Sequence, residues 1–403
     1  METVIVGGGI GGLATAAFLQ HSGHRVHVYE QTSVFREVGA GLVLAPNAVR
    51  LLRRIGLADA LERSATKIRT GWEFRRWQDG QVLFAQDMAE CERMYGEAAW
   101  LVHRADLHEI LIAAVAPSSI HLGYRCVDVK QSETGVRCTF DGNRTVDSEL
   151  LVAADGIHSQ VRRTLVGDIP VRDSGLCAWR ASVPRESLPE RYFEPVQRLW
   201  LGPGRHLVHY PISNGRLVNI VAFTPAGPGR TVESWTTEGD PVEFREAFDG
   251  WHSMVTELLD SVRTVGRWSV FDRDPIERYN YGRIALVGDS AHPMLPFFAQ
   301  GAGQAIEDAA ALSTCMEEVV DTEAALGAYS RVRVPRTAAV QRASHGRATI
   351  NHLADGPAQK SRDDAFRIGD PLADSAWLYG YDAQLEARDG IVRGSLKLPG
   401  ILP

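Results

Sequence analysis

Residues 3–20, TVIVGGGIGGLATAAFLQ, carry the strongest fold signal in this chain. Residues 3–6 predict a short buried strand, and residues 11–20 have the apolar pattern of a helix. Residues 25–29 predict a second strand. The strand, glycine turn, helix and second strand together predict the βαβ unit with which a Rossmann-type domain begins.

Gly7, Gly9 and Gly12 fit the pattern GxGxxG directly after the strand and at the start of the helix. The first glycine allows the tight turn, the second lets the backbone approach a pyrophosphate, and the third lets helix and strand pack closely. Glu30 ends the second strand, where a carboxylate can accept hydrogen bonds from both ribose hydroxyls. Gln31 is included in the predicted cofactor site. The loop alone does not separate FAD from NAD, and a glycine-rich turn without a ligand is a further alternative.

The composition is that of a globular chain with small-molecule partners. Its 403 residues, 44% of them hydrophobic, exceed the usual limit of a single core, so we expect two domains, consecutive or interleaved. A net charge of −7 provides no field that attracts nucleic acid or an anionic membrane. The five cysteines lack CxxC spacing, so neither a disulfide framework nor a metal site is predicted. A cytoplasmic monomer or homodimer, without a membrane span or signal peptide, is expected.

A second fingerprint lies far along the chain. Residues 283–289, RIALVGD, form a strand that ends in Gly288 and Asp289, and a helix then opens at residues 300–303, around Gly301. The dipole of such a helix favours negative charge at its N-terminus.

Three motifs in this order, the glycine loop, Asp155-Gly156 and Gly288-Asp289, resemble those of the single-component FAD-dependent aromatic hydroxylases, or group A flavoprotein monooxygenases. The resemblance implies that the cofactor is FAD. It also implies that Asp289 binds the ribityl chain, and that the helix near Gly301 points at the pyrimidine end of the flavin.

Other residues enter the cofactor site through the same resemblance. The family has an arginine just after the third Rossmann strand, and Arg104 matches that place. Residues 154–162, ADGIHSQVR, match a motif that the family links to both FAD and the nicotinamide cofactor. A strand-ending turn is the alternative for Asp155 and Gly156. Cys126 is also included in the predicted site.

The rest of the chain predicts a second sheet and C-terminal helices. Two alternating runs around Asp79-Gly80, in residues 72–84, predict a hairpin that leaves the first sheet. Aromatic residues in alternating runs predict an antiparallel sheet at 176–268, and helices are expected at 300–315 and 322–353. Further strands are expected at 101–103, 120–130, 135–140, 150–154 and 284–287, with a helix at 106–114.

The predicted fold class is α/β, with a Rossmann-type FAD-binding domain interleaved with an antiparallel-sheet substrate domain and C-terminal helices. Residues 1–175 hold the first part of the FAD-binding domain and its hairpin excursion, 176–270 the substrate-binding sheet, 271–385 the second FAD-binding part with the C-terminal helices, and 386–403 a loosely ordered tail.

Two stretches resemble one branch of this family. Residues 204–211, GRHLVHYP, and 377–382, WLYGYD, are similar to salicylate 1-hydroxylase, 3-hydroxybenzoate 6-hydroxylase and 6-hydroxynicotinate 3-monooxygenase. Because side chains alternate on a strand, His206 and Tyr210 share one face and His209 takes the other.

The resemblance implies that His206 and Tyr210 line the substrate pocket and that His292 lies near the ring to be oxidised. A phenol becomes a better nucleophile when its proton is removed, and histidine has a suitable pKa for this near neutrality. Either histidine is a candidate base. The alternatives are a histidine that fills a sheet face, for His206, and a structural contact beside the flavin, for His292.

The expected pocket wall departs from these relatives at two positions. The 6-hydroxynicotinate enzyme has a histidine where Val43 stands, which weakens the case for a pyridine substrate. The 3-hydroxybenzoate enzyme has a glutamine where Pro296 stands. Phe297 next to it stacks on an aromatic ring or merely packs, and Arg180 and Arg205 are secondary candidates for a carboxylate partner.

The implied reaction is reduction of FAD by NADH or NADPH, formation of a flavin hydroperoxide with dioxygen, and transfer of one oxygen atom to a small phenolic acid such as salicylate or a hydroxybenzoate. A hydroxypyridine hydroxylase, a flavin reductase or dehydrogenase and a non-catalytic flavoprotein are the alternatives. The sequence leaves open the aromatic ring, the position hydroxylated, any loss of a carboxyl group and the choice of nicotinamide.

Overall fold

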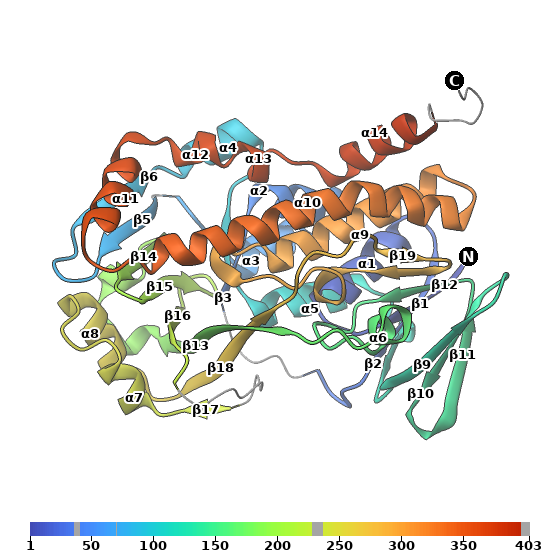
Figure 1. Ribbon diagram of the computed structural model, residues 1–403, viewed down its shortest axis with the longest axis horizontal. Coiled ribbons are helices and arrows are strands. Elements are labelled where there is room, and N and C mark those ends of the chain that lie inside the picture. The colour runs from blue at the N-terminus through green and yellow to red at the C-terminus, as the bar shows by residue number, and fades with distance from the viewer. Residues whose placement is uncertain (36–40, 70, 228–236, 396–403) are drawn as a thin grey trace.

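The computed structural model describes residues 1–35, 41–69, 71–227 and 237–395. Two large sheets lie at opposite ends of an elongated molecule, and the long helices α9 and α10 run between them (Figure 1). The described helices are α1 (Ile10–His21), α2 (Pro46–Arg54), α3 (Ala58–Ser64), α4 (Ala89–Tyr95), α5 (Arg104–Ala114), α6 (Gln160–Val166), α7 (Pro241–Glu246), α8 (Ser253–Asp260), α9 (Gly301–Glu318), α10 (Thr322–Asn351), α11 (Pro357–Ile368), α12 (Pro371–Asp374), α13 (Ala376–Tyr379) and α14 (Ala383–Ser395). Short 3₁₀ turns are η1 (Pro117–Ser119), η2 (Asp141–Asn143), η3 (Arg185–Ser187), η4 (Glu190–Tyr192), η5 (Gly288–Ser290) and η6 (Pro296–Phe298).

The first sheet contains the predicted βαβ unit. Its order is β19-β20-β12-β1-β2-β8, and β1 pairs in parallel with both β2 and β12. Val4, Ile5 and Val6 are buried, because a parallel sheet covered on both faces needs a continuous apolar strand. The strands are β19 (Asn280–Tyr281), β20 (Ile284–Leu286), β12 (Leu150–Ala153), β1 (Glu2–Val6), β2 (Arg25–Glu30) and β8 (Ile120–Leu122).

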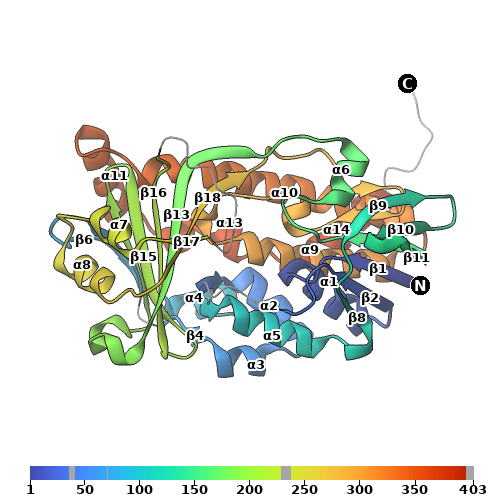
Figure 2. The same ribbon diagram turned by 90° about the horizontal axis from the view of Figure 1, so that it is seen from below.

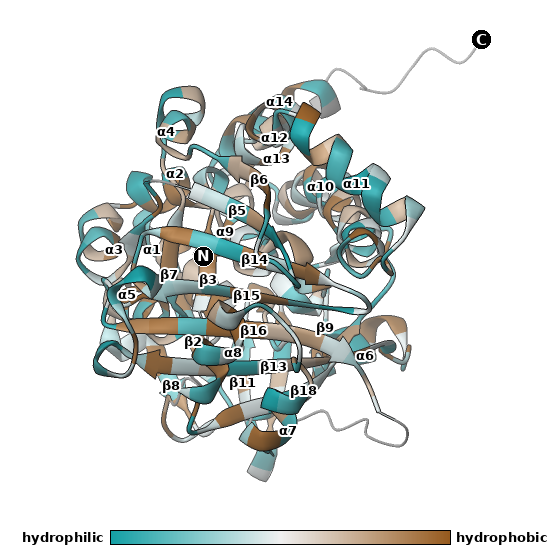
Figure 3. Cartoon of the chain, turned by 90° about the vertical axis from the view of Figure 1, so that its left-hand side faces the viewer, coloured by the Kyte–Doolittle hydropathy of each residue, from teal (hydrophilic) through white to brown (hydrophobic). Residues whose placement is uncertain are grey.

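The second sheet confirms the predicted antiparallel sheet and extends it. Its order is β17-β18-β13-β16-β15-β14-β5-β6, and β14 and β5 form a parallel pair within it. Figure 3 shows most of these strands side by side. They are β17 (Glu238–Gly239), β18 (Val265–Asp272), β13 (Arg172–Pro184), β16 (Leu217–Pro225), β15 (Arg205–Ile212), β14 (Val196–Gly202), β5 (Gly71–Arg76) and β6 (Val82–Gln86).

The predicted hairpin is β5 and β6, and it leaves the first sheet to become the far edge of the second. Residues on both sides of the expected boundary at 175 therefore build the eight-stranded sheet, since β13 already begins at Arg172. The domain boundaries themselves stay predictions.

The strand expected at 101–103 is confirmed as β7, but it pairs antiparallel with β3 and β4 and so is not the third Rossmann strand that the resemblance places before Arg104. The strand expected at 120–130 is split between β8 and β9, which belong to different sheets. The two small sheets are β3 (Gly41–Leu44), β7 (Trp100–His103) and β4 (Thr66–Lys67), and β11 (Arg144–Ser148), β10 (Val136–Phe140) and β9 (Cys126–Gln131).

The loosely ordered tail expected from residue 386 is instead helical as far as Ser395. It belongs to α14, in which Ala383 and Ala387 lie one turn apart and are fully buried in the core that α9 and α10 also line. Two small side chains on one face let this helix approach its neighbours closely. Residues 396–403 lie outside the described residues.

The two faces of the second sheet have different neighbours. Helices α7 and α8 cover its outer face, while α9, α10 and the first sheet lie on the inner side (Figure 2). Trp179, Trp200, Leu207 and Phe244 pack in the outer layer. A site shared by the two sheets therefore lies on the inner face. In the described part of the chain, no helix is long and apolar enough to cross a bilayer.

Candidate active site

The glycine loop is closed toward the protein and open toward the outside. Gly7 has a φ of +106°, and a Cβ at Gly12 would lie 1.9 Å from the carbonyl oxygen of Gly7. A Cβ at Gly9 would meet nothing within 4 Å. Gly9 is the N-cap of α1 and provides no side-chain cap, so the first amides of this helix face an open space. The loop thus fits the pyrophosphate of a dinucleotide.

Glu30 lies against this loop at the end of β2. Its carboxylate accepts hydrogen bonds from the backbone amides of Gly8, at 2.7 Å, and Thr32, at 2.9 Å. The ring atom Nε2 of His108 lies 2.7 Å from the Gly8 carbonyl oxygen and supports the loop from α5. The Gln31 side chain beside Glu30 is exposed.

The second fingerprint forms a similar opening at the other sheet edge. Gly288 has a φ of +60°, and Asp289 after it is exposed and lines a cavity. Burial raises the pKa of Asp289, and the charges of His292 and Arg104 oppose that shift. A Cβ at Gly301 would meet nothing within 4 Å, and α9 begins there without a side-chain cap. The site thus fits a ribityl chain and an anionic ring.

Asp155 makes contacts typical of a turn that begins a helix. Its carboxylate accepts from the Ser159 hydroxyl at 2.5 Å and from the Val161 amide at 3.2 Å, at the start of α6. Gly156 has a φ of +78°. Burial raises the pKa of Asp155. Cys126 lies in β9, outside both large sheets, with its Sγ 3.4 Å from that of Cys138.

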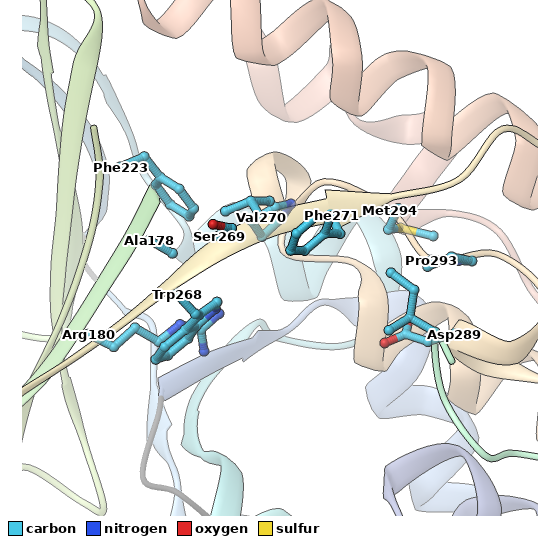
Figure 4. A pocket seen from close by; sticks show the side chains of 12 residues that line it. Ala178, Arg180, Phe223, Trp268, Ser269, Val270, Phe271, Asp289, Pro293 and Met294 are labelled. Carbon is cyan, nitrogen blue, oxygen red and sulfur yellow. The ribbon is translucent and has the colours of Figure 1, made fainter. Parts of the chain in front are cut away.

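A cavity joins Asp289 to the inner face of the second sheet (Figure 4). Its empty volume is about 670 Å³, which includes space open to solvent. Burial lowers the pKa of Arg180 to about 10, and its guanidinium lies 5.1 Å from the ring centroid of Trp268. The cavity is lined by Ile157, Ala178, Arg180, Phe223, Trp268, Ser269, Val270, Phe271, Asp289, Pro293, Met294 and Pro296.

His206 and Tyr210 point to this inner side, and His209 to the outer one. The His206 ring stacks on Phe223, a cavity residue, with centroids 4.8 Å apart, and meets Phe297 edge-on at 5.4 Å. Only 2% of His206 is exposed, and its Nδ1 lies 2.7 Å from Nε2 of His352. Burial, followed by the His352 charge, lowers the pKa of His206.

Tyr210 and Val43 belong to one apolar cluster, which Phe298 also contacts. Burial raises the pKa of the Tyr210 hydroxyl, while the Arg180 charge opposes this shift. The structure thus brings His206, Tyr210, Val43, Pro296 and Phe297 to one side of the second sheet.

His292 occupies a different environment. It is fully buried, and its Nε2 lies 2.5 Å from Oδ2 of Asp308, which also accepts from the Gly288 amide at 2.8 Å. Pro293 lines the cavity but His292 does not. His292 is therefore held in a buried ionic cluster, together with Asp308, Glu307, Arg333, Arg336, Gln304 and Asn47.

The comparisons with known proteins agree with this geometry. Residues 1–344 match the family described as FAD binding domain. The chain belongs to this FAD-binding family. It is 41% identical over 381 residues to a 3-amino-4-hydroxybenzoate 2-monooxygenase of Streptomyces platensis, which covers 94% of this chain and 96% of the relative.

Two further comparisons extend the likeness. A 6-hydroxynicotinate 3-monooxygenase of Pseudomonas fluorescens is 33% identical, with 94% of each chain covered. A salicylate hydroxylase solved as a substrate complex has a TM-score of 0.82, 26% identity, and coverage of 97% of this chain and 98% of that one. The chain is thus an FAD-dependent aromatic-ring monooxygenase, as the motifs predict.

Several residues of this monooxygenase site are absent from the sequence-based prediction. His352 ends a long helix with no motif around it, and His108 lies on a helix whose neighbours in the chain do not indicate a partner. The buried partners of His292 come from α9 and α10. Only the packing of these helices brings the charges together.

His209 should make this monooxygenase less stable in acid. Burial, followed by the charges of Arg198 and Arg75, lowers its pKa to about 3. The unfolded chain binds this proton near pH 6.5 and the folded chain only near pH 3, so stability falls as pH drops through that window. Between pH 7 and pH 5 this histidine should lower the free energy of unfolding by about 2 kcal/mol.

The replacement His209→Phe should remove this part of the pH dependence of the free energy of unfolding, because phenylalanine binds no proton in either the folded or the unfolded state. Urea unfolding of both proteins at pH 7 and pH 5 measures the difference. An equal pH dependence in the two proteins would contradict the assignment.

Proposed function

We propose that this monooxygenase hydroxylates a small phenolic aromatic acid and that His206 accepts the phenolic proton. The observation that carries the proposal is the position of His206 between Phe223 and Phe297, with Nδ1 bonded to His352. Among the described residues nothing hydrogen-bonds to its Nε2. Because burial lowers its pKa, the ring is neutral near pH 7 and its Nε2 can accept a proton.

The chemistry of the cavity favours an aromatic acid. Phe223, Trp268 and Pro296 provide apolar walls for a ring, and Arg180 is a candidate partner for its carboxylate. Relatives at 41% and 33% identity are named for 3-amino-4-hydroxybenzoate and 6-hydroxynicotinate, both aromatic acids with a hydroxyl group. Val43 and the higher identity support a hydroxybenzoate over a hydroxypyridine, which remains the second candidate.

The cofactor residues have separate proposed roles. Gly7, Gly9 and Gly12 receive the pyrophosphate, and Glu30 and Gln31 lie at the ribose, while Asp289 binds the ribityl chain. The N-terminus of α9 at Gly301 stabilises negative charge on the flavin, with Arg104, Asp155, Gly156, Gly288 and Cys126 completing the proposed set.

Bound FAD supplies the redox chemistry: it takes electrons from NADH or NADPH and, with dioxygen, delivers one oxygen atom to the ring and the other to water. The side chains bind and orient the acid, exclude water with apolar walls and remove its phenolic proton. Because His292 is bonded to Asp308, we propose that it positions η5, and with it Asp289.

A substrate screen tests this function. NADH and NADPH oxidation should be measured with 3-amino-4-hydroxybenzoate, hydroxybenzoates, salicylate and 6-hydroxynicotinate, together with the products and hydrogen peroxide. A hydroxylated benzoate formed with oxygen uptake is expected. Nicotinamide oxidation that yields a reduced or dehydrogenated product, without oxygen incorporation, would overturn the proposal.

The variant His206→Ala should retain FAD and lose ring hydroxylation by about 10²-fold or more, the usual contribution of a general base. His206 lies on the second sheet and Gly7 to Gly12 on the first, so cofactor binding is spared. Product formation and flavin absorbance measure the two effects separately. Turnover equal to that of the native enzyme would exclude His206 as the base.

We further propose a cytoplasmic monomer or homodimer whose partners are the aromatic acid and dioxygen, without nucleic acid or membrane. All five cysteines are buried and free, which supports a reducing compartment. Light scattering of the purified protein tests the oligomeric state.

A further inference from the structure

Two histidines far apart in the chain form one hydrogen bond at the candidate base. Nδ1 of His206, on β15, and Nε2 of His352, which caps the C-terminus of α10, are 2.7 Å apart. The backbone of His352 is itself anchored, because its carbonyl oxygen accepts from the Gly204 amide at 3.1 Å in the turn before β15. The contact therefore joins the end of a helix to the strand that holds the base.

The surroundings of the pair leave little choice of hydrogen-bond partner. Phe297 meets both rings edge-on, with centroids 5.4 Å from His206 and 5.9 Å from His352. Phe223 covers the other side of His206. His206 is only 2% exposed, whereas His352 is partly exposed. The pair thus leads from a closed apolar site toward water.

We infer that His352 is the second member of a proton relay, which carries the phenolic proton from His206 to solvent. The inference rests on the proposed role of His206. As Nε2 of His206 takes the substrate proton, its Nδ1–H passes to Nε2 of His352, and the proton on Nδ1 of His352 passes to water. One proton leaves the site, and both rings end neutral with their tautomers exchanged. The reverse transfer, when the product takes up a proton, resets the pair.

The relay solves a problem created by burial. A histidine closed off by Phe223 and Phe297 would have to keep the substrate proton as a positive charge in an apolar site, and burial makes that charge costly. Burial lowers the pKa of His352 to about 4, so this ring is also neutral near pH 7 and able to accept. A neutral acceptor at Nδ1 lets His206 take the proton without becoming charged.

Two replacements of His352 separate the relay from simple support. The amide oxygen of His352→Gln accepts a hydrogen bond from Nδ1 of His206, but the side chain does not pass a proton on. His352→Phe fills a similar volume and does neither. A relay predicts that both variants lower the hydroxylation of 3-amino-4-hydroxybenzoate by about 10- to 100-fold in kcat. The KM should change less than threefold, and FAD content should stay unchanged.

His345→Asn is the matched control, because His345 lies on the same helix but bonds to Asp272 and Arg172 instead. It should hydroxylate at the native rate. Stopped-flow absorbance of the phenolate on binding gives a second readout, and phenolate formation should slow in both His352 variants.

The outcomes distinguish the relay from the proposed function. Native rates in His352→Gln with loss in His352→Phe would mean that His352 only positions His206, and this would overturn the relay. Native rates in both variants would also overturn it. If His206→Ala itself hydroxylates normally, or if the native enzyme hydroxylates none of the screened acids, the proposed function fails and the relay with it.

Discussion

Gly12→Ala is expected to lose the folded glycine loop and, with it, FAD. The new Cβ would lie 1.9 Å from the Gly7 carbonyl oxygen, a backbone atom that has no rotamer with which to move away. Gly7 has no room to shift away, because the carbonyl oxygen of Ala154, just after β12, lies 2.3 Å from the position that a Cβ of Gly7 would take. The loop is closely packed between the ends of β1 and β12. We expect a loss of about 3 kcal/mol or more in the free energy of unfolding.

Gly9→Ala is the matched control for this prediction. A Cβ at Gly9 has nothing within 4 Å and its φ of −76° suits any residue, so the protein should fold normally. The added methyl group occupies space where the pyrophosphate approaches, and FAD affinity should fall.

Thermal unfolding of the FAD-free proteins and titration with FAD separate the two glycines. Native stability and full FAD content in Gly12→Ala would show that the loop is more plastic than its geometry indicates. Native FAD affinity in Gly9→Ala would mean that the pyrophosphate does not approach there.

Arg333→Met should be the most destabilising change within the helices. Arg333 is fully buried, and its guanidinium donates to Asp308 at 2.7 Å and to Glu307 at 2.5 Å. Although burial alone would raise it, the charges of Arg336 and Arg333 hold the pKa of Glu307 low. Removal of the guanidinium leaves two buried carboxylates with too little positive charge, at a cost of about 3–5 kcal/mol.

The same replacement should also lower FAD content. Asp308 holds both the Gly288 amide and His292, so a disturbed Asp308 shifts the turn that carries Asp289. Urea unfolding and flavin absorbance measure the two effects. The control is Arg388→Met, which breaks the exposed pair with Glu318 at 3.2 Å and should cost less than about 1 kcal/mol. Equal losses in the two variants would contradict the importance of burial.

Local pattern predicted the parts of the fold that depend on neighbouring residues. The apolar run 3–6 and the glycines after it lie together in the chain, and their structure follows from sterics and strand burial. The same holds for the alternation that separates His206 from His209. The helical α14 was missed because its burial depends on α9 and α10, which are distant in sequence.

The βαβ unit and the antiparallel sheet could be predicted from residues at short, regular spacing, whereas FAD and the aromatic-hydroxylase family followed from the resemblance of three motifs in order, from the glycine loop to Gly288-Asp289. The bond of His292 to Asp308 and the contact of His206 with His352, 146 residues away, became visible only in the folded chain. Pairs of this kind depend on how α9, α10 and β15 pack. Periodicity indicates which face of an element is buried, but it does not indicate which charged or polar side chain of another element will pack against that face.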